Sequence, residues 1–204
     1  MGEPVIEVMY DEYAQLNNQK VYKFTDQDAL IQNQKDKSLN PINLVKVKRH
    51  GQVKGCSCAD GQPQQEYIPR EQCASSTISN TSLMLILLIA AKEKHHVVTA
   101  NVAGAYLNAK MDDFVLVKFK GRALNIMCQV NPEYTKLIWK AHGQNVMYLQ
   151  LAKALYVCPK LALLWYTLFR STLEDMSLVL NKYDPCVTNK IICFDTTMVV
   201  VTNV

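Results

Sequence analysis

The chain has 204 residues, of which 49% are hydrophobic and 20% are charged, so it is long and apolar enough to bury a substantial core. Its longest apolar run, residues 83–91, is far shorter than the roughly 20 residues that a membrane-spanning helix requires, which argues against a membrane protein. The formal charge of +4 permits a polyanionic partner but does not require one, because many ordinary domains are equally basic.

The N-terminus and the cysteines bear on the compartment. The first residues, Met1-Gly2-Glu3-Pro4, lack the basic segment and the following apolar segment of a secretion signal. The seven cysteines are odd in number and have no repeating spacing, which fits free thiols in a reducing compartment better than a disulfide framework. We therefore expect an intracellular protein, in either the cytoplasm or the nucleus.

The first part of the chain predicts a helix, a connecting segment and a β-hairpin. Apolar residues at helical spacing indicate a short amphipathic helix over residues 4–16. The polar stretch 17–41 is typical of a connecting segment with one helical turn. Residues 43–49 and 52–58 are the two arms of the expected hairpin, because His50-Gly51 between them supplies a turn with positive φ.

This predicted hairpin carries the densest basic cluster of the chain. Five basic side chains fall close together: Lys46, Lys48, Arg49, His50 and Lys54. Alternation along a strand puts Lys46 and Lys48 on the same face. A solvated hairpin explains the cluster on composition alone, and a surface that binds the phosphates of a nucleic acid is the alternative interpretation.

The middle of the chain predicts a loop, a buried helix and a buried strand. Glycine and proline exclude a long regular element over residues 59–77. Ser79 begins a group of capping residues for a helix that runs to about Lys94. This helix is apolar nearly all round, so we expect it to be buried. The short β-branched run 97–100 indicates a buried strand.

The last part of the chain predicts four strands and one long helix. Residues 114–119 and 146–151 are the first two strands. Pro159 suits the first turn of a helix that continues to about residue 176 with a clear apolar face. Residues 187–194 and 197–202 indicate two further strands, which completes an α+β pattern.

General motif searches find little chemistry. Cys56-Ser57-Cys58 lacks a second ligand pair at zinc spacing, which favours ordinary thiols over a metal site. Asp112 and Asp113 are neighbours, and neighbours on a strand point to opposite faces, so these two carboxylates do not easily share one metal ion. A surface turn is the simpler interpretation of that pair.

Four stretches, in the same order as in the family, resemble copia-type reverse transcriptases of retrotransposon polyproteins. They are residues 53–71 at the entry of the fingers, 98–109 in the first palm motif, 153–166 around the later palm helix, and 181–187 before the catalytic hairpin. Each stretch is weak alone. Their collinear order, over about residues 11–190, makes the resemblance specific.

The resemblance implies an α+β right-hand polymerase fold with fingers and a partial palm. Residues 1–40 would be the N-terminal helix and connecting segment of the fingers, and residues 41–204 a fingers and palm domain that is incomplete at its C-terminus. In the family this fold makes DNA from deoxynucleoside triphosphates on an RNA or DNA template-primer. Carboxylates from the first palm motif and from a Tyr-Val-Asp-Asp hairpin hold two Mg²⁺ ions there.

The chain departs from the family at the positions that contact metal and substrate. Asn101 occupies the position of the first carboxylate, and an amide removes a full negative charge from a site that must offset two dications. Cys56 replaces an arginine that contacts the triphosphate, and Lys160 replaces a polar substrate contact, usually glutamine. Val157 stands at a family glycine, where β-branched residues resist the backbone conformation. Tyr106 matches the aromatic ring that excludes a ribose 2′-hydroxyl.

The family pattern is lost beyond Lys190. If residues 201–204 stand in for Tyr-Val-Asp-Asp, then Asn203 and Val204 fall at the paired acids, and neither can replace a carboxylate. Asp195 is the only late acid, and it precedes the last predicted strand instead of lying at its turn. We therefore expect a truncated chain with no intact metal site.

These observations leave three hypotheses. The favoured one is an inactive remnant of the polymerase. The second is a nucleic-acid-binding module in which Lys46, Lys48 and Lys54 hold a template backbone, with Lys54 also placed in the substrate-contacting stretch of the fingers. The third is an active polymerase that is completed by a further C-terminal segment. The exposed β-branched strands expected near the C-terminus would also allow self-association.

Overall fold

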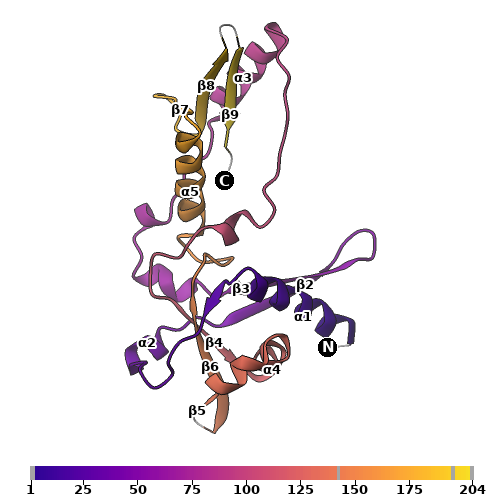
Figure 1. The fold of residues 1–204 in the computed structure, drawn as a ribbon, viewed down its shortest axis with the longest axis vertical. Coiled ribbons are helices and arrows are strands. Elements are labelled where there is room, and N and C mark those ends of the chain that lie inside the picture. Colours follow the sequence, from indigo (N-terminus) through magenta and orange to yellow (C-terminus); the bar gives the residue numbers. More distant parts are fainter. Residues whose placement is uncertain (1–2, 142, 194–195, 203–204) are drawn as a thin grey trace.

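The computed structural model describes residues 3–141, 143–193 and 196–202, and it shows an α+β protein with three small antiparallel sheets. Figure 1 shows two parts along the long axis, a lower part built on a four-stranded sheet and an upper part built around α5 (Leu161–Asp175). Among the described helices, none is both long and apolar enough to cross a membrane. The α+β class expected from the sequence is confirmed.

The sheet of the lower part is built around one central strand. Its strands are β1 (Tyr22–Lys23), β4 (Leu116–Lys120), β5 (Trp139–Ala141) and β6 (Gln144–Leu151). β4 pairs along one edge of β6, and the short β1 and β5 share its other edge. Between them the Gln27 amide replaces a strand, because it donates to the Tyr148 carbonyl at 2.9 Å and accepts from the Tyr148 N–H at 3.1 Å. The two strands predicted here, 114–119 and 146–151, are confirmed.

One face of this sheet forms the main core with α1 (Glu3–Asn18) and α4 (Gly121–Val130). Phe119 of β4 meets the rings of Tyr13 and Tyr22 edge-on, with centroids 6.0 and 5.5 Å away. The helix predicted over residues 4–16 is therefore confirmed. This helix shares its core with strands that lie about a hundred residues later in the chain, because its apolar side chains pack on them.

The opposite face of the same sheet is only partly covered. A small apolar cluster of Leu116, Val146, Tyr148 and Leu30 lies there. Beside it runs the five-residue helix α2 (Gln32–Asp36), which is the single helical turn expected within residues 17–41.

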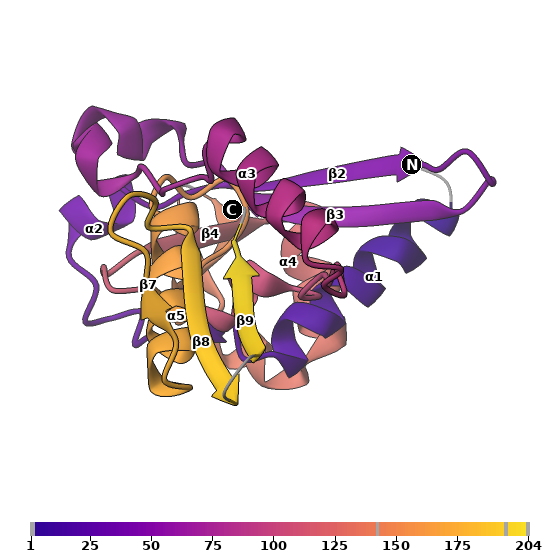
Figure 2. The ribbon, with the colours of Figure 1, turned by 90° about the horizontal axis from the view of Figure 1, so that it is seen from above.

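The predicted hairpin is confirmed as β2 (Pro41–Val47) and β3 (Val53–Ala59), with Gly51 in the turn at a φ of +79°. Figure 2 shows it extending from the body as an arm. Toward its tip the arm packs closely on α1, since a Cβ atom added to Gly55 would lie 3.0 Å from the Val8 side chain. A larger residue there would require the neighbouring atoms of α1 to shift.

The helix predicted from Ser79 exists, but its predicted burial is wrong. α3 (Asn80–Lys92) begins after Ser79, whose Oγ accepts from the Ser82 N–H at 3.0 Å. Only Ala90 of this helix is buried, and Leu88 is 67% exposed. An apolar sequence favours burial, but burial also needs a covering element, and within the described ranges α3 has no extensive packing partner.

The buried strand predicted over residues 97–100 is also wrong. These residues are irregular, and Val98 is 85% exposed. Figure 1 shows the chain after α3 descending from the top of the molecule toward the short 3₁₀ helix η3 (Ala105–Asn108). A strand needs a neighbour for its N–H and C=O groups, and this segment is not paired with the upper sheet.

The upper part contains α5 and a three-stranded antiparallel sheet. Its strands are β7 (Val179–Leu180), β8 (Val187–Cys193) and β9 (Thr196–Val201). β8 lies in the centre, with Val187 opposite Val201 on β9. The long helix and both late strands are confirmed, although α5 starts after Lys160 and not at Pro159. Three further 3₁₀ helices are η1 (Gln62–Glu66), η2 (Arg70–Gln72) and η4 (Pro132–Leu137).

Candidate functional site

A cavity of about 400 Å³ lies where four segments meet in the upper part, and we call it the Asn101 cavity. Its walls come from residues 100–106, from Tyr156, from one face of α5 and from the end of β9. The structure therefore brings Asn101 and Tyr106, two residues singled out from the sequence, into one cavity with the last described strand. Cys56, Lys54, Lys160, Lys46 and Lys48 are not among its lining residues.

Tyr106 reaches the cavity because of the turn that precedes it. Gly104 has a φ of +60°, a conformation that side chains other than glycine seldom adopt, and it starts the 3₁₀ helix η3 that carries Tyr106. The Tyr106 ring meets Tyr156 edge-on, with centroids 6.2 Å apart. Desolvation raises the pKa of Tyr156, and the neighbouring Cys56 and Glu12 raise it further.

The α5 wall consists of two stacked aromatic rings. Trp165 and Phe169 are four residues apart on the helix, and their centroids are 5.4 Å apart with an interplanar angle of 29°. Sequence reasoning missed Phe169 as a site residue. The available signal was its spacing from Trp165, because side chains four residues apart lie on the same face of a helix.

The β9 wall ends in Thr202, which is held by two bonds to one carbonyl. The Thr202 N–H and hydroxyl both donate to the Cys186 oxygen, at 2.9 and 3.2 Å. The paired acid positions that the resemblance assigns to Asn203 and Val204 lie outside the described residues, as does Asp195.

The polar side chains on the described walls of the Asn101 cavity are neutral. Asn101, Thr202 and the tyrosine hydroxyls supply them, and no aspartate or glutamate lines this part of the cavity. Throughout residues 3–141, 143–193 and 196–202, no group of three or more His, Cys, Asp or Glu side chains is arranged to hold a metal ion.

Lys160 is held by Asp112 and Asp113, the pair for which the sequence favoured a surface turn. Its Nζ lies 2.7 Å from Asp113 Oδ2 and 3.4 Å from Asp112 Oδ2. The surface turn that the sequence favoured for this pair is confirmed, because residues 111–115 are irregular instead of forming a strand. The hydrogen bond that Lys160 donates to the Asp113 carboxylate is the main cause of the raised pKa of Lys160. Its ammonium group thus ties the start of α5 to the turn before β4.

Cys56 lies beside a second thiol on β3. Residues two apart on a strand share a face, and the sulfur atoms of Cys56 and Cys58 are 3.6 Å apart. Burial raises the pKa of Cys58 to about 12, and burial also raises the pKa of Cys158 to about 11. Cys58 and Cys158 are therefore protonated, weakly nucleophilic thiols at neutral pH.

The lysines of the hairpin arm are exposed and close to one another. Lys46 lies directly opposite Lys54 in the β2–β3 register. Lys48 lies just beyond the end of β2, where its Nζ donates to Gln52 Oε1 at 3.2 Å. The described residues place no carboxylate within ion-pairing distance of these three ammonium groups, so the tip of the arm carries uncompensated positive charge.

The stretch 181–187 has a structural role that sequence reasoning missed. The Asp184 carboxylate accepts from the Ser79 N–H at 3.1 Å and from the Cys186 N–H at 3.0 Å. Hydrogen bonding from Ser82, and then from the Ser79 backbone, lowers the pKa of Asp184. Tyr166 of α5 donates to the Pro185 carbonyl at 3.0 Å. This stretch therefore joins the start of α3 to α5 and β8.

Comparison with known proteins adds no relative, because no family model, no curated protein and no solved structure matches this chain.

Proposed function

We propose that this chain is a catalytically inactive remnant of a retrotransposon RNA-directed DNA polymerase. The observation that carries the proposal is the composition of the Asn101 cavity. Asn101 and Tyr106 stand at the family positions for a metal-binding acid and a ribose-excluding ring, and they share this cavity with the end of β9. In a right-hand polymerase the strand that leads into the catalytic hairpin would approach the first palm motif in this way.

The same cavity supports the loss of catalysis. Two-metal nucleotidyl transfer needs closely spaced carboxylates, and Mg²⁺ prefers such hard anionic ligands together with substrate phosphates. The described walls offer neutral oxygen atoms from Asn101 and Thr202. These groups are a poor match to a pair of dications, so we assign no catalytic step to a bound metal.

Primer extension tests the proposal. The whole chain is incubated with a primed RNA template, deoxynucleoside triphosphates and either Mg²⁺ or Mn²⁺, beside an active reverse transcriptase as positive control. We expect no product above the background without protein. Extension by this chain would overturn the proposal and favour the third hypothesis, that of a working polymerase, whether or not a further C-terminal segment improves its rate.

The hairpin arm supports a second candidate function, nucleic-acid binding without catalysis. Like charges directly opposite each other weaken a hairpin, and Lys46 and Lys54 are so placed without a carboxylate partner among the described residues. A bound phosphate backbone would relieve that repulsion. RNA/DNA template-primer is the partner that the family resemblance suggests.

Salt dependence tests this second candidate. If Lys46 and Lys54 contact phosphates, affinity for an RNA/DNA hybrid falls as salt rises, and the double variant Lys46→Gln/Lys54→Gln reduces the log–log slope by about 2. The control is Lys92→Gln/Lys182→Gln, which removes the same charge from exposed positions elsewhere. Equal slopes for the two double variants would exclude the arm as the binding surface.

A further inference from the structure

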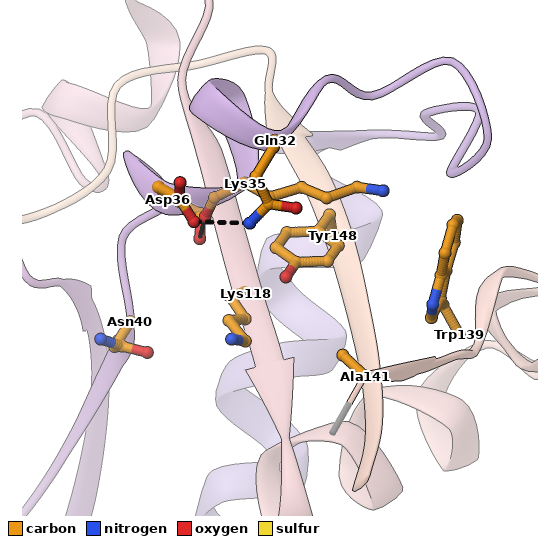
Figure 3. Close-up of a pocket in the computed structure, with 9 residues that line it drawn as sticks. Gln32, Lys35, Asp36, Asn40, Lys118, Trp139, Ala141 and Tyr148 are labelled. Atoms are coloured by element: carbon orange, nitrogen blue, oxygen red, sulfur yellow. Dashed lines mark hydrogen bonds between the residues drawn. The ribbon is translucent and has the colours of Figure 1, made fainter. Parts of the chain in front are cut away.

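A second cavity, of about 340 Å³, lies in the lower part on the partly covered face of the sheet, and we call it the Trp139 hollow. Figure 3 shows its lining side chains, which come from α2, from the segment before β2, and from β4, β5 and β6. Its volume is at the lower end of the range for small-molecule sites, about 300 to 1,000 Å³. The hollow thus has room for one small ligand.

The charged groups of the Trp139 hollow favour an anion. Lys35 and Lys118 both line it, and neither ammonium group forms an ion pair with another described residue. The one carboxylate, Asp36, already accepts from Gln32 Nε2 at 2.7 Å, as the dashed line in Figure 3 shows. With two lysines and one aspartate, the lining has a net charge of +1.

The hollow also contains two aromatic rings on the rigid sheet. The Tyr148 ring is almost fully buried, and its backbone is held on both edges, by Lys118 on β4 and by the Gln27 amide. Trp139 on β5 is only half buried, and Figure 3 shows its ring standing at the side of the hollow. A half-exposed ring such as that of Trp139 is a stacking surface for a planar ligand.

We propose that the Trp139 hollow binds a nucleotide unit, with its base stacked on Trp139 and its phosphate held by Lys118 and Lys35. Base stacking on aromatic rings together with lysine contacts to phosphate is how proteins bind nucleotides irrespective of sequence. The unit is either a free mononucleotide or one residue of a single strand. This site is separate from the Asn101 cavity, so it does not depend on the proposed function.

Lys35 must move when the base enters. Its Nζ lies 3.9 Å from the centre of the Trp139 ring, where it occupies the ring face. A cation–π contact at an exposed site is weaker than the stacking of a base on an aromatic ring. Lys35 extends from a surface helix on a flexible stem, so its ammonium group can leave the ring and meet the phosphate.

Tryptophan fluorescence and calorimetry test the proposal on the whole chain. The chain has two tryptophans, so the Trp165→Phe background leaves Trp139 as the only reporter. We expect AMP, and a short oligoadenylate, to quench this fluorescence. In calorimetry, Trp139→Leu should weaken AMP binding at least about fivefold and Lys118→Gln about tenfold.

Lys140→Gln is the matched control. Lys140 lies between Trp139 and Ala141 on β5, so its side chain points away from the hollow that its two neighbours line. The Lys140→Gln substitution removes the same charge from an exposed position, and we expect it to leave the affinity for AMP unchanged. Circular dichroism of each variant confirms that the fold is retained.

The two sources of the ligand are distinguished by the two probes. Equal affinity per site for AMP and oligoadenylate supports a free nucleotide, and binding of the oligonucleotide alone supports a single strand. The proposal is overturned if neither probe binds, or if Lys140→Gln weakens binding as much as Lys118→Gln. It is equally overturned if inorganic phosphate binds as tightly as AMP and Trp139→Leu has no effect, because the hollow would then be a simple anion site.

Discussion

Val157 adopts a backbone conformation that suits glycine and not a β-branched residue. Its φ is +74°, and its carbonyl faces Gly61, where an added Cβ would lie 2.3 Å from the Val157 oxygen. The resemblance places a family glycine at this position, so the sequence predicted a backbone conformation that valine resists. The positive φ confirms that conformation. A left-handed conformation costs a residue other than glycine about 1–2 kcal/mol.

Val157→Gly should therefore stabilise the protein. The relief of the left-handed conformation is partly offset by the greater freedom of glycine in the unfolded chain, which leaves a gain of about 0.5–1 kcal/mol in the free energy of unfolding. Urea denaturation of the two proteins measures this gain. Val179→Gly is the control: it replaces an exposed strand valine, for which we expect a loss of stability.

Asp184 makes the stability of the α3 junction depend on pH. Its pKa in the folded protein lies below the ordinary value of 3.8, so its contribution is fully present above that pH and is lost as the pH falls through the folded pKa. Asp184→Asn should lower the free energy of unfolding by about 1 kcal/mol at pH 7, because the Ser79 and Cys186 N–H groups lose a charged acceptor.

Urea denaturation at a series of pH values checks this expectation. The difference between wild type and Asp184→Asn should shrink as the pH falls below 3.8, because the wild-type carboxyl group then becomes protonated. The control is Asp175→Asn, an exposed carboxylate on α5, for which we expect little difference at any pH. If the stability difference between wild type and Asp184→Asn grew as the pH fell, the predicted direction of the pH dependence would be wrong.

At the scale of elements, periodicity located most helices and strands but did not show what covers them. α3 and α5 both have many apolar residues, yet only Ala90 of α3 and Tyr166 and Leu173 of α5 are buried. The spacing of apolar residues and the capping of helices are local properties of a sequence. The helix start at Ser79 and the hairpin turn at Gly51 were therefore predictable. Burial depends on a partner element from elsewhere in the chain, which no local pattern reveals.

The exposure of α3 has a direct mutational test. Leu88→Ala should change the free energy of unfolding by less than about 0.5 kcal/mol, because Leu88 is 67% exposed and alanine favours helix. Leu124→Ala in α4 is the matched helical control, and its 2% exposure predicts a loss of about 2–5 kcal/mol. A comparable loss at Leu88 would mean that α3 is covered in solution, as by a second copy of the chain.

Short elements that depend on distant partners could not be predicted. β1 has two residues and exists because it pairs with β6, more than a hundred residues later in the chain. The Gln27 amide, which bonds to Tyr148 at the same edge, has no sequence signature at all. The Trp139 hollow is lined by segments far apart in the chain, from α2 to β6, and for this reason sequence reasoning did not find it.

At the scale of the whole molecule, the residues singled out from the sequence do not all lie in one place. Asn101 and Tyr106 share one cavity, whereas Lys160 is bound to two aspartates and the lysines Lys46 and Lys54 lie on the hairpin arm. The aromatic wall of Trp165 and Phe169 was not predicted as part of the site. Motifs that follow one another in the family order show only how segments are arranged along the sequence. A cavity depends on the packing of α5 against η3 and β9.

The most direct test of the central claim is primer extension by the Asn101→Asp variant. The claim is that the Asn101 cavity resembles a polymerase centre but lacks the carboxylates for two metal ions, so restoring one acid should not restore activity. We expect wild type and Asn101→Asp to give equal background product with Mg²⁺ and with Mn²⁺. Clear extension by Asn101→Asp would contradict the claim, because it would show that the other metal ligands are present in the chain.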